Sequence, residues 1–585
     1  MMDYGALNEK VKMVTDIANL LRGPYSSERY GDVIIPLSII RRFDCILASK
    51  NEDIKKELQA LADKGLEPQE KEQLVSRRCG VPFYNEKCLT LEELVGDASS
   101  LDNTFKEFVG AYSISVQKIL KGLQFQTQID TMVKKGLLFQ VVKAFSELDF
   151  NPEHADPLTM GYIFEEIIRT YKANAEAGDH YTPREVIELC VDLMLADREQ
   201  DLLKQGKVLR AYDGCCGTGG MLTVMQRRVH ELSQGNATVK LFGEDSNDVA
   251  YATCCAEMLM LGEDANNIVS GNTLLKPDKE RNSDVVGDAF YGQKFDLLLT
   301  NPPFGVEWKN EKTAVLAEAA SDSKDNRFRR GTPRISDGQM LFLENLLAKA
   351  EDDARIAIIL NGSPLFSGDA GSGESEIRRY VVERGLLEAI VALPDQMFYN
   401  TGINTYIWVL SKRHMAKRQG KVQLINATEF FEPQKPKSLG NKRKYISKTD
   451  RQRILELYVA CEENEYSKFF EPREFGYTKV VVDRPLLDAA GQIVTDKKGK
   501  PKADSAKRDT ENIPLLEDVD AYLAREVYPY APDAFVDRDK DKVGYEIPFT
   551  RYFYHYQPPR PAETVLREIL ELEQAVTQSL QSLLK

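Results

Sequence analysis

The chain has 585 residues, 29% of them charged, and a formal net charge of −14 at pH 7. This length fits several domains of roughly 100–200 residues each, and no apolar run reaches the roughly 18 residues that would predict a membrane span. An acidic chain is poorly suited to bind duplex DNA tightly by itself, because neutralisation of phosphates supplies most nonspecific affinity.

The nine cysteines and five histidines show no metal-binding spacing. Cys215-Cys216 and Cys254-Cys255 are adjacent pairs, not C-x-x-C motifs. The N-terminus lacks the charged and then apolar pattern of a secretion signal. We therefore expect reduced thiols in a cytoplasmic protein, with no metal and no membrane among its partners.

Residues 1–150 are predicted to form a helical domain. Apolar residues recur at helical spacing over residues 7–21, 33–47 and 105–148. No cluster of catalytic residue types lies in this region, so we expect a domain without chemistry of its own.

A capped helix is predicted next, over residues 186–195. Thr182 is expected to be its N-cap, with Pro183 at the first helical position and Glu185 at the third. This order is the start of a capping box.

A strand over residues 208–212, a glycine-rich loop from Asp213 to Met221 and a helix over 222–232 follow. Strand, loop and helix form the first unit of a nucleotide-binding α/β fold. The loop has no GxxxxGK(S/T) pattern and contains neither Lys nor Arg, so nothing in it balances a polyphosphate. The acidic Asp213 suits a ligand with a cationic group instead.

A second strand, over residues 239–243, ends in Glu244 and Asp245. A carboxylate at such a strand end accepts hydrogen bonds from a ribose diol in dinucleotide-binding folds. The pattern therefore predicts a ribose contact at this end of the sheet.

The apolar run 295–300 predicts a buried strand that ends at Asn301-Pro302-Pro303-Phe304. Two consecutive prolines make a rigid, extended turn just past the strand end, where open α/β sheets place their sites. The Asn301 oxygen and the Pro302 carbonyl can accept two N–H bonds, and Phe304 can stack on a ring. This set suits an exocyclic amine on a planar base.

The alternation of helices and strands continues to residue 410. Helices are expected over 340–350 and 374–384, and strands over 355–360, 387–393 and 405–410. We predict an α/β fold, a Rossmann-like doubly wound sheet covered on both faces, with a helical N-terminal domain and a mixed C-terminal region ending in a helix.

The C-terminal region carries two recognisable features. Residues 488–511 are polar and rich in Lys and Asp, as in an exposed hairpin or a disordered loop. In the last helix, apolar residues recur at steps of four and three, interrupted at Ser579. These residues are Val565, Ile569, Leu572, Val576 and Leu583. Such a seam can pack on its own domain, but its place after a Pro-rich break favours a partner helix.

Five segments together resemble the adenine-N6 amino-methyltransferases of DNA. Residues 301–304 match their (D/N/S)PP(Y/F/W) motif, 213–220 resemble DPACGTGG, and 267–274 resemble their GDTL segment. Residues 178–183 resemble G-x-(F/Y)-Y-T-P, and 243–247 match G-x-(D/E)-x-N, which selects Asp245 over Glu244. The order of these segments along the chain (closing turn, cofactor loop, catalytic turn) resembles the γ arrangement of these enzymes, in which target recognition lies outside these segments.

The resemblance implies S-adenosylmethionine as cofactor, adenine in DNA as substrate, and a flipped target base. Asn301 and Pro302 would hold the N6 amine and Phe304 would stack on the base, with Pro303 completing the catalytic turn. The residues that it assigns to the cofactor are Asp179, His180, Tyr181, Thr182, Pro183, Arg184, Asp213, Gly217, Thr218, Gly219, Asp245, Asn272 and Thr273. The chain departs from the family pattern at Gly214 and Cys215, and Asn272 replaces the acid that faces the adenine ring of the cofactor.

The helical N-terminal domain and residues 337–339, 360–362 and 393–395 resemble the modification subunits of type I restriction-modification systems. The resemblance implies a separate specificity subunit flanked by two copies of this chain, and it leaves open whether a restriction nuclease subunit joins them. The predicted domains are helical 1–150, catalytic 151–415, a mixed extension 416–561 and a partner-binding helix 562–585.

Two basic clusters have different expected roles. We expect Arg327, Arg329, Arg330 and Arg334, in a loop soon after the catalytic turn, to touch phosphates around the extruded base. The second cluster is expected to be solvated surface. It consists of Lys435, Lys437, Lys442, Arg443 and Lys444.

Three alternative functions stay open at this point. The same turn serves stand-alone DNA or RNA amino-methyltransferases and protein amide methyltransferases, and the chain could be a catalytically silent structural subunit of a DNA-binding complex. The intact Asp213, Asp245 and Asn301 argue against silence.

Overall fold

A computed structural model gives the structure of the chain. It divides into two compact units, Met1–Ile547 and Pro548–Lys585. The described residues are 4–155, 157–172, 182–196, 198–277, 287–399, 401–413, 416–418, 420–434, 441–496, 499–554, 556 and 560–583. Asp179, His180 and Tyr181, and also Lys435 and Lys437, lie outside them.

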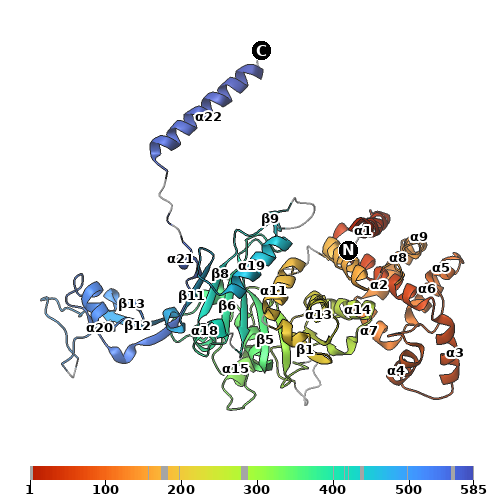
Figure 1. Cartoon of the computed structure of the whole chain (residues 1–585), viewed down its shortest axis with the longest axis horizontal. Helices are drawn as coiled ribbons and strands as arrows, with labels where there is room; N and C mark the ends of the chain where they lie inside the picture. Colours follow the sequence, from red (N-terminus) through yellow and green to blue (C-terminus); the bar gives the residue numbers. More distant parts are fainter. Residues whose placement is uncertain are drawn as a thin grey trace. The chain divides into compact units, whose positions relative to one another are not determined.

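The N-terminal part is helical, as predicted (Figure 1). Its helices are α1 (Tyr4–Ala18), α2 (Gly31–Leu47), α3 (Asn51–Leu61), α4 (Pro68–Cys79), α5 (Leu91–Val95), α6 (Leu101–Gly110), α7 (Ile114–Gly122), α8 (Phe125–Lys134), α9 (Leu138–Ser146) and α10 (Pro157–Lys172). Helix α2 is buried along nearly its whole length, and its buried charges Arg41 and Asp44 pair with each other at 2.5 Å.

Nine strands of the described chain form one large sheet in the order β11-β8-β6-β7-β5-β4-β1-β2-β3. Their bounds are β1 (Lys207–Asp213), β2 (Ala237–Asp245), β3 (Ile268–Ser270), β4 (Phe295–Thr300), β5 (Ala350–Asn361), β6 (Leu387–Ala392), β7 (Thr405–Ser411), β8 (Val422–Asn426) and β11 (Ser467–Phe470). Strands β3, β2, β1, β4 and β5 are parallel, whereas β7 runs antiparallel between β5 and β6. The predicted α/β sheet is therefore confirmed.

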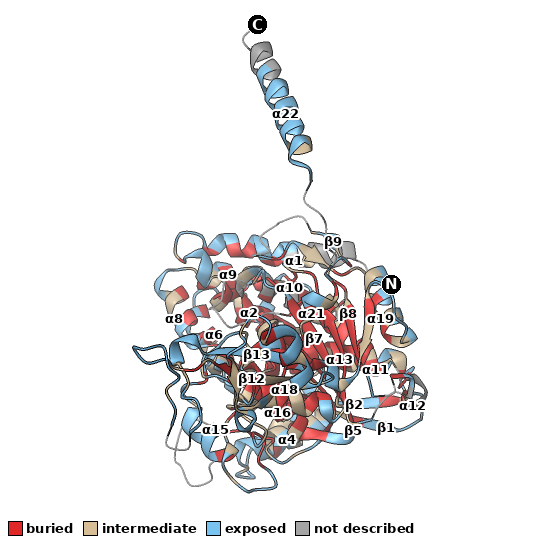
Figure 2. Ribbon diagram, turned by 90° about the vertical axis from the view of Figure 1, so that its left-hand side faces the viewer, coloured by how far each residue is buried: buried red, intermediate tan, exposed pale blue. Residues whose placement is uncertain are grey.

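Helices cover the sheet, and its strands β4, β6 and β7 are almost entirely buried (Figure 2). They are α11 (Arg184–Leu195), α12 (Glu199–Leu202), α13 (Gly220–Leu232), α14 (Asp248–Met260), α15 (Lys312–Ala319), α16 (Gln339–Lys349), α17 (Ser363–Phe366), α18 (Gly373–Glu383) and α19 (Lys448–Ala460). Helices α11 and α13 lie against each other and against the central strands. No helix within the described ranges combines the length and apolarity that a membrane crossing needs.

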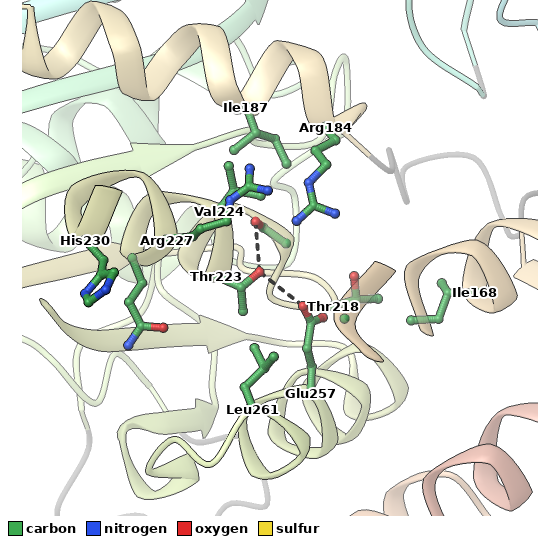
Figure 3. A pocket seen from close by; sticks show the side chains of 13 residues that line it. Ile168, Arg184, Ile187, Thr218, Thr223, Val224, Arg227, His230, Glu257 and Leu261 are labelled. Carbon is green, nitrogen blue, oxygen red and sulfur yellow. Dashed lines mark hydrogen bonds between the residues drawn. The ribbon is translucent and has the colours of Figure 1, made fainter. Parts of the chain in front are cut away.

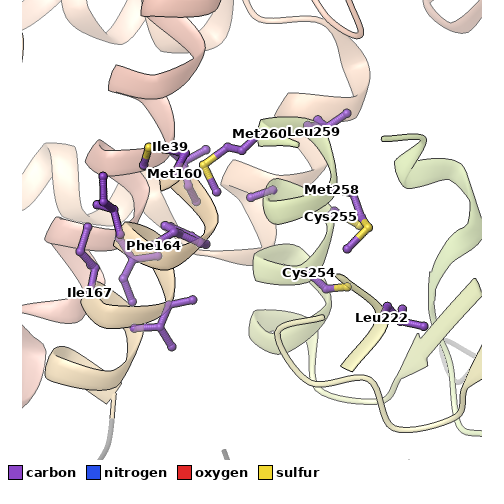
Figure 4. Packing of buried hydrophobic residues seen from close by; sticks show 14 of the residues in the cluster. Ile39, Met160, Phe164, Ile167, Leu222, Cys254, Cys255, Met258, Leu259 and Met260 are labelled. Carbon is purple, nitrogen blue, oxygen red and sulfur yellow. The ribbon is translucent and has the colours of Figure 1, made fainter. Parts of the chain in front are cut away.

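The N-terminal helices pack directly on α14, and one apolar cluster runs through both parts (Figure 4). Met160 of α10 lies beside Met260 of α14 at this contact, whereas Met258 is on the other side of α14. Gly122, at the end of α7, allows the close approach, because a Cβ there would lie 2.8 Å from the Cβ of Ala252.

A small sheet follows the large one. It consists of β12 (Gly476–Asp483), β13 (Asp509–Pro514), β14 (Phe535–Val536) and β15 (Lys542–Tyr545). With helix α20 (Val519–Tyr522) it encloses a separate apolar cluster around Val480 and Ile513. Between β12 and β13, antiparallel bridges such as Pro485 to Ala503 close an exposed hairpin, which is one of the two forms predicted for residues 488–511. Strands β9 (Glu432–Pro433) and β10 (Lys444–Tyr445) form a further short pair.

The second unit contains α21 (Phe549–Tyr552) and α22 (Ala562–Leu583). Large apolar side chains of α22 are exposed (Figure 2). They are Leu566, Ile569, Leu570, Leu572 and Val576, each more than half exposed.

Candidate active site

The candidate site lies at the carboxyl ends of the parallel strands β1, β2 and β4. The chain order reverses between β4 and β1, which is where ligands bind in open α/β sheets. The loop after β1 and the turn 301–304 after β4, the predicted catalytic turn, therefore emerge side by side.

Thr300, the last residue of β4, joins these two segments. Its hydroxyl donates to Asp213 Oδ1, and it lies 3.5 Å from the Cys215 sulfur. The Cys215 amide also donates to Asp213 Oδ1, at 3.1 Å. No motif indicated Thr300, yet it is fully buried and fixes the catalytic turn to the glycine-rich loop.

Asp213 is buried, and burial raises the pKa of its carboxyl to about 7. The hydrogen bonds from Thr300 and Cys215 lower that pKa, and the charge of Asp245 raises it. Asp213 is thus a buried acid whose charged neighbour, Asp245, is also an acid. A cationic ligand would favour the ionised form of its carboxyl, so the position is suited to such a ligand.

Asp245 holds the glycine-rich loop. Its Oδ2 accepts from the Gly217 amide at 2.8 Å, and its Oδ1 accepts from the Asn247 amide at 2.8 Å. Gly217 and Gly219 have positive φ, and a Cβ on Gly219 would lie 2.8 Å from the Cys254 sulfur. The loop therefore requires glycine at both positions.

Glu244 points away from this loop. It is fully buried, accepts from the Ala289 amide at 2.8 Å and receives the hydroxyl of Thr273. Burial raises the pKa of its carboxyl to about 7. Of the two acids at the end of β2, Asp245 is the one whose carboxylate contacts the glycine-rich loop, whereas Glu244 reaches it only through its backbone carbonyl, which accepts from the Cys216 amide.

Asn272 and Thr273 are engaged within the protein. Asn272 donates to Glu311 Oε1 at 2.9 Å and accepts from the Leu274 amide at 3.0 Å. Thr273 is buried, with its hydroxyl on Glu244. The structure thus brings Asn272 together with Glu311, a residue that no motif indicated.

The catalytic turn presents one unusual atom. Asn301 donates from Nδ2 to Thr182 Oγ1 at 2.8 Å, whereas its Oδ1 is buried and accepts no hydrogen bond from the described residues. A buried acceptor without a donor costs about 1–3 kcal/mol. Phe304 lies edge-to-face with Phe398, with ring centroids 6.0 Å apart, and Pro302 is buried beside the half-buried Pro303.

The predicted capping box at α11 is wrong. The helix begins at Arg184, with Pro183 as N-cap and no side-chain capping bond. Thr182 receives the Asn301 amide instead, and Glu185 pairs with the buried Lys442. The side chains of Thr182 and Glu185, which the local pattern assigned to the cap, form tertiary contacts instead.

A pocket of about 280 Å³ borders the glycine-rich loop (Figure 3). Thr218 and Arg184, both predicted cofactor residues, line it together with α13. Within it, Thr223 donates to Glu257 Oε1 at 3.1 Å.

The predicted phosphate-contacting role is wrong for Arg327. It is 2% exposed and pairs with Glu318 and Asp288. Its guanidinium also donates to the carbonyl oxygens of Thr273 and Leu274. Arg327 therefore fixes the loop after the catalytic turn to the interior.

The other arginines of the first cluster and the described members of the second cluster, Lys442, Arg443 and Lys444, also have protein partners. Arg330 lies 4.0 Å over the Tyr380 ring, Arg329 donates to carbonyls of its own loop, and the half-exposed Arg334 pairs with Asp337. Lys442 is 1% exposed, so the prediction of a solvated surface is wrong for it.

Comparison with known proteins identifies two matching family models. The model of the N-6 DNA methylase family matches residues 155–481, and that of the HsdM N-terminal domain matches residues 11–145. The methylase subunit of type I restriction enzyme MjaVII from Methanocaldococcus jannaschii is 27% identical over 300 residues, 51% of this chain and 47% of the relative. The HindI methylase subunit from Haemophilus influenzae is 26% identical over 278 residues, 46% of this chain and 54% of the relative.

The chain spans about half the length of the curated relatives that it matches. Among solved structures, the methyltransferase subunit of a type I restriction-modification system from Streptococcus thermophilus has a TM-score of 0.61 at 19% identity. The match covers 80% of this chain and 97% of that one, and it shows a shared fold.

Proposed function

The chain belongs to the N-6 DNA methylase family, and from this premise we propose that it methylates the N6 amine of adenine in DNA with S-adenosylmethionine. The observation that carries the proposal is the buried Asn301 Oδ1, which accepts no hydrogen bond from the described residues and lies in the turn joined to the glycine-rich loop. An exocyclic amine donates the hydrogen bonds that this oxygen needs.

The substrate side follows from the turn. Asn301 Oδ1 and the Pro302 carbonyl would accept the two N6 hydrogens and orient the nitrogen lone pair, and Phe304 would stack on the ring. The adenine must leave the duplex to reach them, at a cost of a few kcal/mol. No strong base is required, because the amine can lose its proton after transfer.

The cofactor side fits the acids around the loop. The bound cofactor would supply an electrophilic methyl group. Asp213, a buried acid, would hold its cationic amino group, and Asp245, at the end of β2, would hold the ribose hydroxyls. The absence of Lys and Arg from residues 213–221 is consistent with a ligand that has no polyphosphate.

The names of the curated relatives support a modification subunit of a type I system. We expect two copies of the chain to flank one specificity subunit, which would supply sequence recognition. The exposed apolar side chains of α22 are suited to a partner helix. Methyl transfer that depends on Asp213, Asp245 and Asn301 would distinguish this proposal from a catalytically silent subunit.

Cofactor affinity should depend on pH through Asp213. The carboxyl is mostly protonated below its pKa of about 7, and a cationic ligand binds the ionised form. Affinity should therefore rise about tenfold from pH 6 to pH 8, as the proton leaves. Calorimetric titration at several pH values measures this. Asp213→Asn is the matched control and should bind the cofactor weakly at every pH. An affinity of the unaltered chain that does not vary with pH would contradict the assignment of Asp213 to the cationic group of the cofactor.

The test is to reconstitute the chain with the expected specificity subunit and to supply DNA and cofactor labelled at the methyl group. We expect label in the DNA from the complex and none from the isolated chain. Label in protein or RNA but not in DNA would refute the proposal.

A further inference from the structure

Asn301 and Thr182 contact each other from segments 119 residues apart. Asn301 Nδ2 donates to Thr182 Oγ1 at 2.8 Å, and Thr182 is only 9% exposed. The two ends of the Asn301 amide therefore differ in hydrogen bonding. The nitrogen has a protein partner, and the buried oxygen has none among the described residues.

Both partners are held stiffly. Asn301 and Thr182 each precede a proline, which restricts their backbones to extended conformations. Thr182 is β-branched and therefore has few side-chain rotamers. The helix that follows it is tied to its surroundings by Arg227 on Glu188 at 2.5 Å and by Lys442 on Glu185.

We infer that Thr182 is a positioning residue for Asn301, and this inference rests on the proposed function. By accepting the Nδ2 hydrogen, the hydroxyl keeps Oδ1 turned toward the place of the target amine. When the amine donates to Oδ1, both ends of the amide are satisfied. The family resemblance assigns Thr182 to the cofactor, whereas its contact with Asn301 points to a different role.

Loss of the hydroxyl has a defined consequence. Nδ2 becomes a buried donor without an acceptor, and the amide gains freedom to rotate. In the rotated form the amide would present N–H groups to an amine that itself donates hydrogen bonds. The extruded base would then be bound less well in the reactive orientation, while the acids that serve the cofactor stay in place.

The experiment compares Thr182→Val, which keeps the shape without the hydroxyl, with Thr182→Ser, which keeps the hydroxyl, in the reconstituted complex. We expect the single-turnover rate of adenine methylation to fall about tenfold to a hundredfold in the valine variant. Cofactor affinity should change by no more than about threefold, and the serine variant should recover most of the rate. Thr104→Val, the same change on α6, where the hydroxyl only donates to the Ser100 carbonyl of its own helix, is the matched control and should leave the rate near that of the unaltered complex.

Thr182→Ala, which adds no atom, should show the same loss and guards against misfolding of the valine variant. Equal rates for the valine, alanine and serine variants would overturn the inference. So would a loss of cofactor affinity comparable to that of Asp245→Ala, because Thr182 would then serve the cofactor. If the unaltered complex methylates no adenine, the proposed function itself fails, and that result is obtained before any variant is compared.

Discussion

Asn301→Ala is expected to abolish methyl transfer while cofactor affinity stays within about a few-fold of its original value. The variant loses the buried Oδ1 acceptor, which serves the target amine, but it keeps the Asp213 and Asp245 carboxylates. Neither acid contacts the Asn301 side chain, whose bond goes to Thr182. Calorimetric titration with S-adenosylmethionine and labelled methyl transfer, performed on one preparation, measure the two effects.

Asp245→Ala should give the opposite pattern. Cofactor binding should weaken by about 1–3 kcal/mol through the loss of charge-assisted bonds to the ribose, and the loop should loosen because the Gly217 amide loses its acceptor. Asn236 directly precedes β2, at the end of the strand opposite to Asp245. Asn236→Ala is therefore the control for asparagine removal and should change neither methyl transfer nor cofactor affinity. Equal losses of binding in the Asn301 and Asp245 variants would refute the division of roles.

Truncation after Pro561 should leave cofactor affinity intact but should largely abolish association with the specificity subunit. The cut removes α22, which lies outside the larger compact unit and exposes large apolar side chains, including Ile569 and Leu572. Burial of each such side chain on a partner is worth about 1.5–3 kcal/mol before ordering costs. Co-purification of the two subunits measures the effect.

Point variants separate the apolar side of α22 from the helix as a whole. Leu572→Asp should weaken association, whereas Gln574→Ala, on the other side of the helix, should not. Undiminished complex formation by the truncated chain would show that the helix serves another purpose.

Local sequence patterns predicted the strands and the turns that follow them. The run that became β4 is apolar and ends at two prolines, and β1 ends at a glycine-rich loop, so both patterns identify a strand and its end without tertiary information. The antiparallel insertion of β7 between β5 and β6 was not predicted, because strand pairing depends on contacts far apart in the sequence.

Side-chain partners were harder to predict than elements. Thr182 and Glu185 fit a capping box, but contacts with Asn301 and Lys442 outcompete the cap. Arg327 lies in a polar loop, where a charge usually meets solvent, yet Glu318 and Asp288 make a buried position for it. Thr300 belongs to no motif, since its role exists only once β1 and β4 lie side by side.

The most direct test of the proposed chemistry is nucleoside mass spectrometry of DNA treated with the reconstituted complex and cofactor. The proposed function predicts N6-methyladenine in the product, and none when Asn301→Ala replaces the unaltered chain. N4-methylcytosine as the sole methylated base would contradict it.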